Sequence, residues 1–244
     1  MLRTLWYYIV LFISTVIHAS TAVVASLLGV SLKPGGIYDW CARDWVRWDL
    51  WAAGTPVLVD GMERIPHGTP FVAAANHTSL FDILALSLVL PGSVRFVAKE
   101  ELTRIPLFGR AMRVAGNVPI ERTHKAHAIE AYHVAADTIR RGVSMVVFPE
   151  GTRSRTGDLL PFKNAPFGLA IAAQVPLIPV YVQDTFRILP KGAWRLHPQP
   201  IRVFIGEPIP TDGLTLQDRI DLRDRTRAAI QALRTRVDAP PPHP

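Results

Sequence analysis

Cysteine is almost absent from this chain of 244 residues, in which Cys41 stands alone. A single thiol cannot form an internal disulfide, so the sequence fits a reducing compartment. The chain also lacks a Gly-x-Ser-x-Gly segment, and with it the usual signature of an enzyme that forms an acyl-serine intermediate. Its histidines are scattered without the spacing of metal ligands, so we expect no metal site.

Charge is missing between Leu5 and Leu32, an uncharged run that Arg3 and Lys33 bracket. As a helix this run would span about 42 Å, more than the roughly 30 Å hydrocarbon core of a bilayer. It could cross the membrane or lie obliquely in one leaflet, since its serines, threonines and His18 moderate its hydrophobicity. A cleaved signal peptide is the alternative interpretation.

A second segment, residues 37–53, is rich in tryptophan and follows a Pro-Gly-Gly turn. Trp45, Trp48 and Trp51 are spaced three apart and would form a stripe on a helix, with charged residues around the remainder. Ordinary core packing would explain such a stripe, but its position beside the apolar run favours an amphipathic helix at a membrane interface. We therefore predict that residues 1–54 form a membrane-anchoring helical hairpin.

Basic residues outnumber acidic ones, with 27 Lys and Arg against 20 Asp and Glu and a formal net charge of +7. Such a surface is drawn to anionic partners, which include phospholipid leaflets, nucleic acids and acidic carrier proteins. The basic residues are spread along the chain and accompany no recognised nucleic-acid module. We therefore expect a membrane surface as a partner and no nucleic acid.

Beyond the hairpin, short apolar runs alternate with helical patterns. Strands are predicted at 57–59, 71–75, 94–98, 143–148, 177–182 and 201–205, and helices at 80–90, 102–115, 126–141 and 216–237. This alternation predicts an α/β domain over residues 55–238, with a largely parallel sheet flanked by helices. The Pro-rich residues 239–244 cannot continue a helix, and we expect them to form a disordered tail.

The segment Asn76-His77-Thr78-Ser79-Leu80-Phe81-Asp82 follows one of these predicted strands. On one continuous helix, His77 and Asp82 would point about 140° apart and could not pair. If Ser79 caps a helix that begins at Leu80, Asp82 lies in the first turn, and His77 in the preceding loop can fold back onto the carboxylate. That contact would leave the other imidazole nitrogen free to act as a general base. The alternative is a chance pairing, but ligand sites favour such strand ends.

A second polar segment, Phe148-Pro149-Glu150-Gly151-Thr152-Arg153-Ser154, follows the strand predicted at 143–148. Gly151 would let the backbone approach a ligand closely, and the planar guanidinium of Arg153 matches a phosphate group. A solvated basic loop is the alternative explanation for this segment taken alone. Together with the first segment it predicts an anion site beside a base.

Two further blocks complete a series. One block lies between the two polar segments and includes Lys99-Glu100-Glu101-Leu102 and Pro119-Ile120-Glu121-Arg122. The other block follows both segments and consists of Val175-Pro176-Leu177-Ile178-Pro179-Val180. Four blocks in this order resemble the glycerolipid acyltransferase family, most closely its bacterial lysophosphatidic acid acyltransferase branch. One departure is Lys163-Asn164-Ala165-Pro166, where relatives commonly have a Lys-Thr-Gly-type run, and it leaves the preferred acceptor open.

The resemblance implies that His77 and Asp82 are the catalytic pair. It also implies an acceptor site made of Lys99, Arg122, Glu150, Gly151, Thr152, Arg153 and Ser154. The implied reaction transfers a fatty acyl group from a thioester of CoA or acyl carrier protein to the sn-2 hydroxyl of 1-acyl-glycerol-3-phosphate, which gives phosphatidic acid. No cofactor is implied beyond the acyl thioester as co-substrate.

The partners implied by the resemblance are the phospholipid bilayer, a lysophospholipid acceptor and the acyl thioester. The implied location is the inner (cytoplasmic) membrane, with the catalytic domain facing the cytoplasm. Two alternatives stay open. The chain could acylate another lyso-lipid, such as a lyso-aminolipid or a glycolipid, or it could be a non-catalytic lipid-binding protein.

Overall fold

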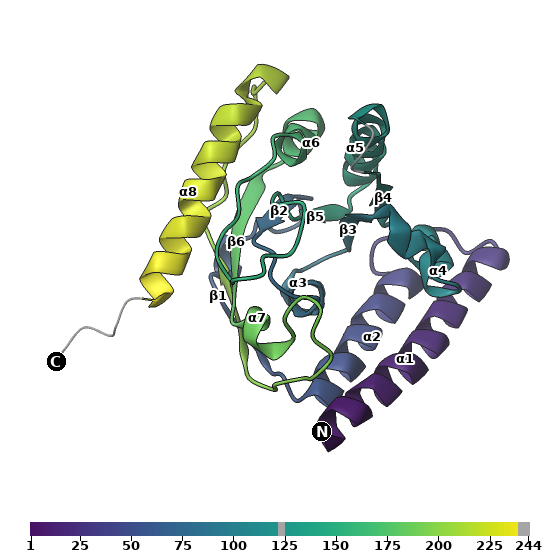
Figure 1. Cartoon of the computed structure of the whole chain (residues 1–244). Coiled ribbons are helices and arrows are strands. Elements are labelled where there is room, and N and C mark those ends of the chain that lie inside the picture. The colour runs from purple at the N-terminus through teal and green to yellow at the C-terminus, as the bar shows by residue number, and fades with distance from the viewer. Residues whose placement is uncertain (122–124, 239–244) are drawn as a thin grey trace.

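The computed structural model of the protein describes residues 1–121 and 125–238. At its centre is a seven-stranded sheet in the order β1-β7-β6-β2-β5-β3-β4 (Figure 1). The strands are β1 (Val57–Asp60), β2 (Val72–Ala75), β3 (Val94–Lys99), β4 (Val118–Ile120), β5 (Ser144–Val147), β6 (Leu177–Gln183) and β7 (Ile201–Ile205). Only β6 and β7 pair antiparallel among these strands, so the predicted largely parallel sheet is confirmed.

Helices lie on both faces of this sheet. They are α1 (Leu2–Leu27), α2 (Ile37–Ala53), α3 (Phe81–Val89), α4 (Phe108–Val114), α5 (Lys125–Arg140), α6 (Ala165–Ala173), α7 (Thr185–Ile188) and α8 (Arg219–Asp238). The helix predicted from residue 216 begins only at Arg219, because a 3₁₀ turn closed by a capping box of Thr215 and Asp218 precedes it. The tail predicted at 239–244 lies outside the described residues.

The single helix predicted over residues 102–115 is wrong in its first half. A 3₁₀ turn covers Glu100–Arg104, and α4 begins only at Phe108. Pro106 has no backbone N–H for a helical ladder, and Leu107 has a positive φ of 61°, so the chain cannot continue as one helix through this point.

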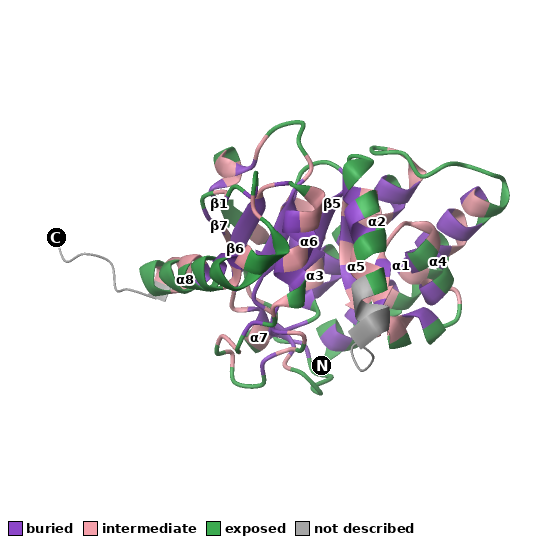
Figure 2. Cartoon of the chain, turned by 90° about the horizontal axis from the view of Figure 1, so that it is seen from above, coloured by how far each residue is buried: buried purple, intermediate pink, exposed green. Residues whose placement is uncertain are grey.

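Alternate residues of β2 supply two separate cores. Ala73 and Ala75 belong to a core that α1, α2 and α3 cover, whereas Val72 and Ala74 belong to one that α5, α6 and α8 cover. All the residues of β2 are buried, as expected for a parallel strand with helices on both faces. Figure 2 shows these buried strands between helices whose outer sides are exposed.

The helices α1 and α2 form the predicted hairpin and pack together through polar side chains. Ser14 Oγ donates to Asp49 Oδ1 at 2.9 Å, and His18 Nε2 lies 3.0 Å from Asp44 Oδ2. These polar residues of α1 therefore face α2, which leaves the opposite side of α1 apolar and exposed. Leu2, the first residue of α1, is 86% exposed.

The hairpin also shares the core of the α/β domain. Tyr7 and Val10 of α1, with Val46 and Leu50 of α2, are buried in the same cluster as β2 and α3. Among the described residues, α1 is a helix long and apolar enough to cross a membrane, a test that a buried core helix or a signal sequence also passes. Membrane association of this apolar helix is therefore plausible on length and composition.

Candidate active site

The polar segments follow strands that lie side by side and run in the same direction. β5 is flanked by β2 and β3 and is parallel to both, so the carboxyl ends of all three strands meet at one edge of the sheet. His77 follows β2, Glu150 follows β5, and Lys99 ends β3. Segments that are far apart in the sequence thus form a single site at the strand ends, the usual position of ligand sites in open α/β sheets.

The loop before α3 folds His77 back onto Asp82, as predicted. His77 Nδ1 lies 2.8 Å from Asp82 Oδ2, which also accepts the backbone N–H groups of Thr78 at 2.7 Å and Ser79 at 2.9 Å. The prediction that Ser79 caps this helix is wrong. The helix begins at Phe81, and the Asp82 carboxylate itself binds the free N–H groups before the first turn, because a charged acceptor binds them more strongly than a hydroxyl.

The imidazole of His77 is fixed in the orientation that a general base needs. A carboxylate oxygen this close to Nδ1 favours the tautomer with the proton on Nδ1, which leaves Nε2 as the proton acceptor. The ring stacks on Phe148 with a centroid distance of 3.9 Å and an interplanar angle of 16°. The His77 side chain keeps 13% exposure, whereas that of Asp82 is fully buried. Only the histidine is therefore open to a substrate.

Two residues for which the sequence predicted no role lie around this pair. The hydroxyl of Thr185, at the start of α7, donates to Asp82 Oδ1 and lies 2.7 Å from the hydroxyl of Thr78. Asn76 binds the backbone of Val182 twice, with its Nδ2 donating at 2.9 Å and its Oδ1 accepting at 2.7 Å. The position of Asn76 beside His77 was a usable signal for this role, whereas no local pattern marks Thr185.

Glu150 is a buried side chain that shapes the loops around His77. Its Oε1 accepts the backbone N–H of His77 at 2.8 Å, and its Oε2 accepts that of Leu160 at 3.1 Å. The residue is 4% exposed, and this burial raises the pKa of the carboxyl to about 7, although the two backbone N–H donors act in the opposite direction. Both oxygens are thus directed at protein backbone, although the sequence led us to expect a contact with the acceptor.

The other residues of this segment are of two kinds: some are buried and bind the protein backbone, and others are exposed to solvent. Ser154 is fully buried, its N–H donates to the carbonyl of His77 at 2.8 Å, and its hydroxyl accepts the N–H of Gly157. Gly151 has a φ of 70°, and a Cβ there would lie 2.9 Å from the side chain of Lys163. Thr152 is exposed, so the open part of this loop faces solvent beside the histidine.

The remaining residues expected at the acceptor site lie further along the sheet edge. Arg153 is half-buried, in the same loop as Thr152. Lys99 ends β3, two strands from β2 and therefore roughly 10 Å away, and its Nζ pairs with Glu101 at 2.7 Å. Arg122 lies outside the described residues. Among the described residues no group of three or more His, Cys, Asp or Glu side chains is arranged to hold a metal ion.

An apolar cavity of about 460 Å³ lies between the hairpin, α3, α4 and β3. Leu80, Ile83 and Leu84 line it, so it borders the helix that carries Asp82. The wall further along holds Arg95, which is 2% exposed and pairs with Asp39 of α2 at 2.5 Å. Its volume falls in the range of pockets that hold small molecules, and its lining suits a hydrocarbon chain.

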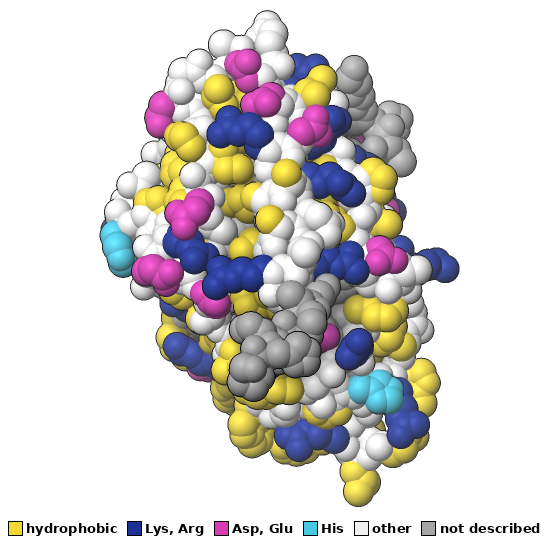
Figure 3. Space-filling view, turned by 90° about the vertical axis from the view of Figure 1, so that its left-hand side faces the viewer, with side chains coloured by type: hydrophobic (Ala, Val, Ile, Leu, Met, Phe, Trp, Pro, Cys, Tyr) yellow, Lys and Arg dark blue, Asp and Glu magenta, His cyan; other side chains and the backbone are white. Residues whose placement is uncertain are grey.

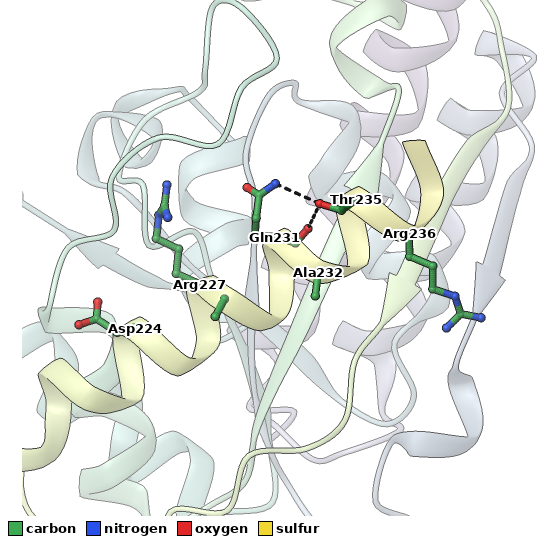
Figure 4. Close-up of a pocket in the computed structure, with 7 residues that line it drawn as sticks. Asp224, Arg227, Gln231, Ala232, Thr235 and Arg236 are labelled. Atoms are coloured by element: carbon green, nitrogen blue, oxygen red, sulfur yellow. Dashed lines mark hydrogen bonds between the residues drawn. The ribbon is translucent and has the colours of Figure 1, made fainter. Parts of the chain in front are cut away.

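A second hollow, on the outer face of α8, is shallow and of mixed charge. Its lining consists of Asp224, Arg227, Ala228, Gln231, Ala232, Thr235 and Arg236 (Figure 4). Acidic and basic side chains alternate over this side of the molecule (Figure 3). Since α8 covers the face of the sheet opposite α3, this hollow is separate from the site around His77.

Comparison with known proteins finds relatives over most of the chain. The sequence profile of the acyltransferase family matches residues 56–183. A 1-acyl-sn-glycerol-3-phosphate acyltransferase of Cocos nucifera is 35% identical over 67% of this chain and 53% of its own length. An enzyme of the same name from Limnanthes douglasii is 33% identical over 86% of this chain and 76% of its own. The chain thus spans about half the length of the coconut protein.

A solved structure is also similar to the whole chain, including the hairpin. The crystal structure of a 1-acyl-sn-glycerophosphate (LPA) acyltransferase from Thermotoga maritima superposes with a TM-score of 0.81 and 27% sequence identity. The superposition covers 98% of this chain and 97% of that one. The arrangement of hairpin and mixed, mostly parallel sheet is therefore shared with that structure.

Proposed function

Since the chain belongs to the glycerolipid acyltransferase family, we propose that it transfers a fatty acyl group from a thioester to the free hydroxyl of 1-acyl-glycerol-3-phosphate, which gives phosphatidic acid. The observation that carries the proposal is the contact between His77 and Asp82 at the carboxyl edge of the sheet. The partly exposed imidazole of His77 lies at this edge with the basic loop after β5, and an apolar cavity borders the helix of Asp82. These are the three features that acylation of an anionic lipid requires.

In the proposed reaction, His77 Nε2 removes the proton of the acceptor hydroxyl as that oxygen attacks the thioester carbonyl. Asp82 stabilises the imidazolium that forms, and a positioned base of this kind contributes about 10²- to 10⁴-fold in rate. The carbon–sulfur bond then breaks, and the imidazolium returns the proton to the leaving thiolate. The acyl group passes directly between substrates, so the proposal requires no nucleophilic residue of the protein.

We assign the phosphate of the acceptor to the open part of the loop after β5. Arg153 offers a planar pair of donors, and Thr152 adds a hydroxyl at the exposed edge of the site. Lys99 lies at the next strand end and contributes positive charge at longer range. Glu150 and Ser154 act behind this surface, because their polar atoms already bind the backbone of the two loops.

The cavity beside α3 would receive a hydrocarbon chain of a substrate. It is predominantly apolar, and Ile83 and Leu84 place its wall on the helix of Asp82. The exposed apolar side of α1 would rest in one leaflet of the membrane, so that the acceptor is reached from the lipid surface. The donor would be a thioester of CoA or acyl carrier protein, and the membrane would be the inner membrane, with the site facing the cytoplasm.

The test is product analysis by mass spectrometry. Purified protein is mixed with both donor thioesters and with lysophosphatidic acid, a lyso-aminolipid or a glycolipid acceptor, and His77→Ala serves as the matched control. We expect phosphatidic acid with the wild type and almost none with the variant. Acylation of the phosphate-free acceptors alone would overturn the acceptor assignment. Lipid binding without any ester product would identify a non-catalytic lipid-binding protein.

A further inference from the structure

The segment between α7 and β7, residues 189–200, exposes an aromatic residue between two cations. Trp194 is 59% exposed, and Lys191 and Arg195 on either side are also exposed. No aspartate or glutamate occurs from Thr185 to Pro200, so the formally charged side chains of the segment are all basic. An exposed indole flanked by cations is the composition that proteins place at the headgroup level of a membrane.

The backbone of this segment is tied to the body of the protein on both sides of Trp194. Ser79 Oγ donates to the carbonyl of Leu189 at 2.8 Å, and Tyr8 Oη donates to that of Trp194 at 2.9 Å. The N–H of Leu196 donates to Thr4 Oγ1 at 3.2 Å, and its side chain is buried. The indole is therefore held outward by a fixed backbone.

Those contacts also set the segment beside the apolar end of α1. Thr4 and Tyr8, which bind it, lie one turn apart on the helix and flank Leu5 and Trp6. Leu5 is 61% exposed, and Trp6 is partly exposed with its ring packed edge-on against Trp51 at 5.8 Å. The exposed apolar surface of the hairpin thus continues onto Trp194.

The same segment reaches the proposed acceptor loop. Lys191 Nζ donates to Thr152 Oγ1 at 3.0 Å, which leaves two of the three ammonium donors for other partners. Residues 190–195 therefore connect the outer end of α1 with the loop of Arg153. A surface that lies on the membrane at this point would bring the open side of the site to the lipid headgroups.

We propose that residues 190–195 are a second membrane-contact element, which binds the phosphates of anionic lipids through Lys191 and Arg195 and inserts Trp194 at the interface. The element adds to the hairpin and orients the site toward the bilayer. It deepens the proposed function, because it supposes that the acceptor is taken from a membrane. The partner is an anionic lipid surface, since the apolar continuity with α1 and the exclusively basic charges of the segment both point to it.

The test measures vesicle binding of the full-length protein and of Trp194→Ala/Arg195→Ala. Vesicles are made of equal parts phosphatidylcholine and phosphatidylglycerol, or of phosphatidylcholine alone. We expect at least about fivefold weaker partitioning to the anionic vesicles, the fold-change that loss of one cation near such a surface implies. The loss should be smaller on phosphatidylcholine vesicles. Arg195→Glu should weaken anionic binding further.

The matched control is Leu216→Ala/Arg225→Ala, which removes one exposed aliphatic residue and one exposed cation around the start of α8. It should bind vesicles as the wild type does. Brominated lipids should quench wild-type tryptophan fluorescence more than that of Trp194→Phe. Unchanged vesicle binding of the Trp194 and Arg195 variants, or an equal loss in the control, would overturn the proposal.

Measurements of acyl transfer distinguish a failure of this membrane-contact proposal from a failure of the proposed function. Trp194→Ala/Arg195→Ala should lose acyl transfer to acceptor embedded in anionic vesicles and keep its rate with a short-chain, water-soluble acceptor. If no protein acylates any acceptor, the proposed function fails, while the binding experiment still decides the membrane contact. If vesicle binding is intact but use of a donor bound to carrier protein falls, the surface binds that protein and the membrane proposal is overturned.

Discussion

Glu150→Gln distinguishes a positioning role from contact with the acceptor. The carboxylate accepts two backbone N–H groups, from His77 and Leu160, and is almost completely buried. Glutamine has nearly the same shape but only one accepting oxygen, so its amide nitrogen must face one of the two donors. The variant therefore leaves one buried N–H unsatisfied, in a loop that holds the proposed base.

The expected loss follows from that unsatisfied donor. Leaving a buried donor without a partner costs about 1–3 kcal/mol. If this cost falls on the arrangement that places His77, kcat/KM should drop by about 5- to 160-fold. Because Glu150 lies behind the site, the loss should appear in kcat, and KM for lysophosphatidic acid should change little.

The pH profile gives a second readout. Burial raises the pKa of Glu150 to about 7, so the carboxyl gains a proton as the pH falls below this value. The added O–H competes with a backbone donor, and the wild-type rate should therefore contain a fall below about pH 7 that Glu150→Gln lacks. Glu207→Gln, at a glutamate that is 80% exposed, is the control and should leave rate and profile unchanged. A raised KM with unchanged kcat would refute the positioning role.

Further expectations concern four other residues. His77→Ala should lower kcat by about 10²- to 10⁴-fold with vesicle binding intact, and a near-normal rate would exclude it as the base. Thr185→Val removes the donor to Asp82 Oδ1 and should lower kcat, whereas Thr185→Ser should restore it. Arg153→Lys should raise KM for the phosphorylated acceptor by about tenfold but not for a phosphate-free one. Burial raises the pKa of Asp49 from 3.8 to about 7, so the folded protein holds a proton that the unfolded chain releases. The free energy of unfolding should therefore decrease by up to about 4 kcal/mol as the pH rises across this interval, and Asp49→Asn should remove that slope in chemical denaturation.

Local patterns in the sequence were sufficient for the class of fold and for the central pair. Alternating apolar strands and helices predicted the largely parallel sheet, because each such element must bury one side. The spacing of His77 and Asp82 required a loop between them, and the structure has that loop. Pro106 argues against a continuous helix over 102–115, because proline has no backbone N–H to extend the helical hydrogen bonding.

The partners of this pair depended on the order of the strands. β6 lies beside β2, which brings Thr185 to Asp82 and Val182 to Asn76 across more than a hundred residues of chain. Alternation of strands and helices does not specify which strands are neighbours. No spacing in the sequence could therefore have identified Thr185.

In the hairpin, too, the sequence determines some features and the tertiary structure decides others. The sequence determined that α1 is apolar and that α2 carries a tryptophan stripe, because helical periodicity is local. Only the tertiary structure decided that Ser14 binds Asp49 and that Trp194 and Leu196 lie against the start of α1. A buried polar side chain takes whichever partner the packed helices and strands bring within reach, and that choice is made when distant parts of the chain meet.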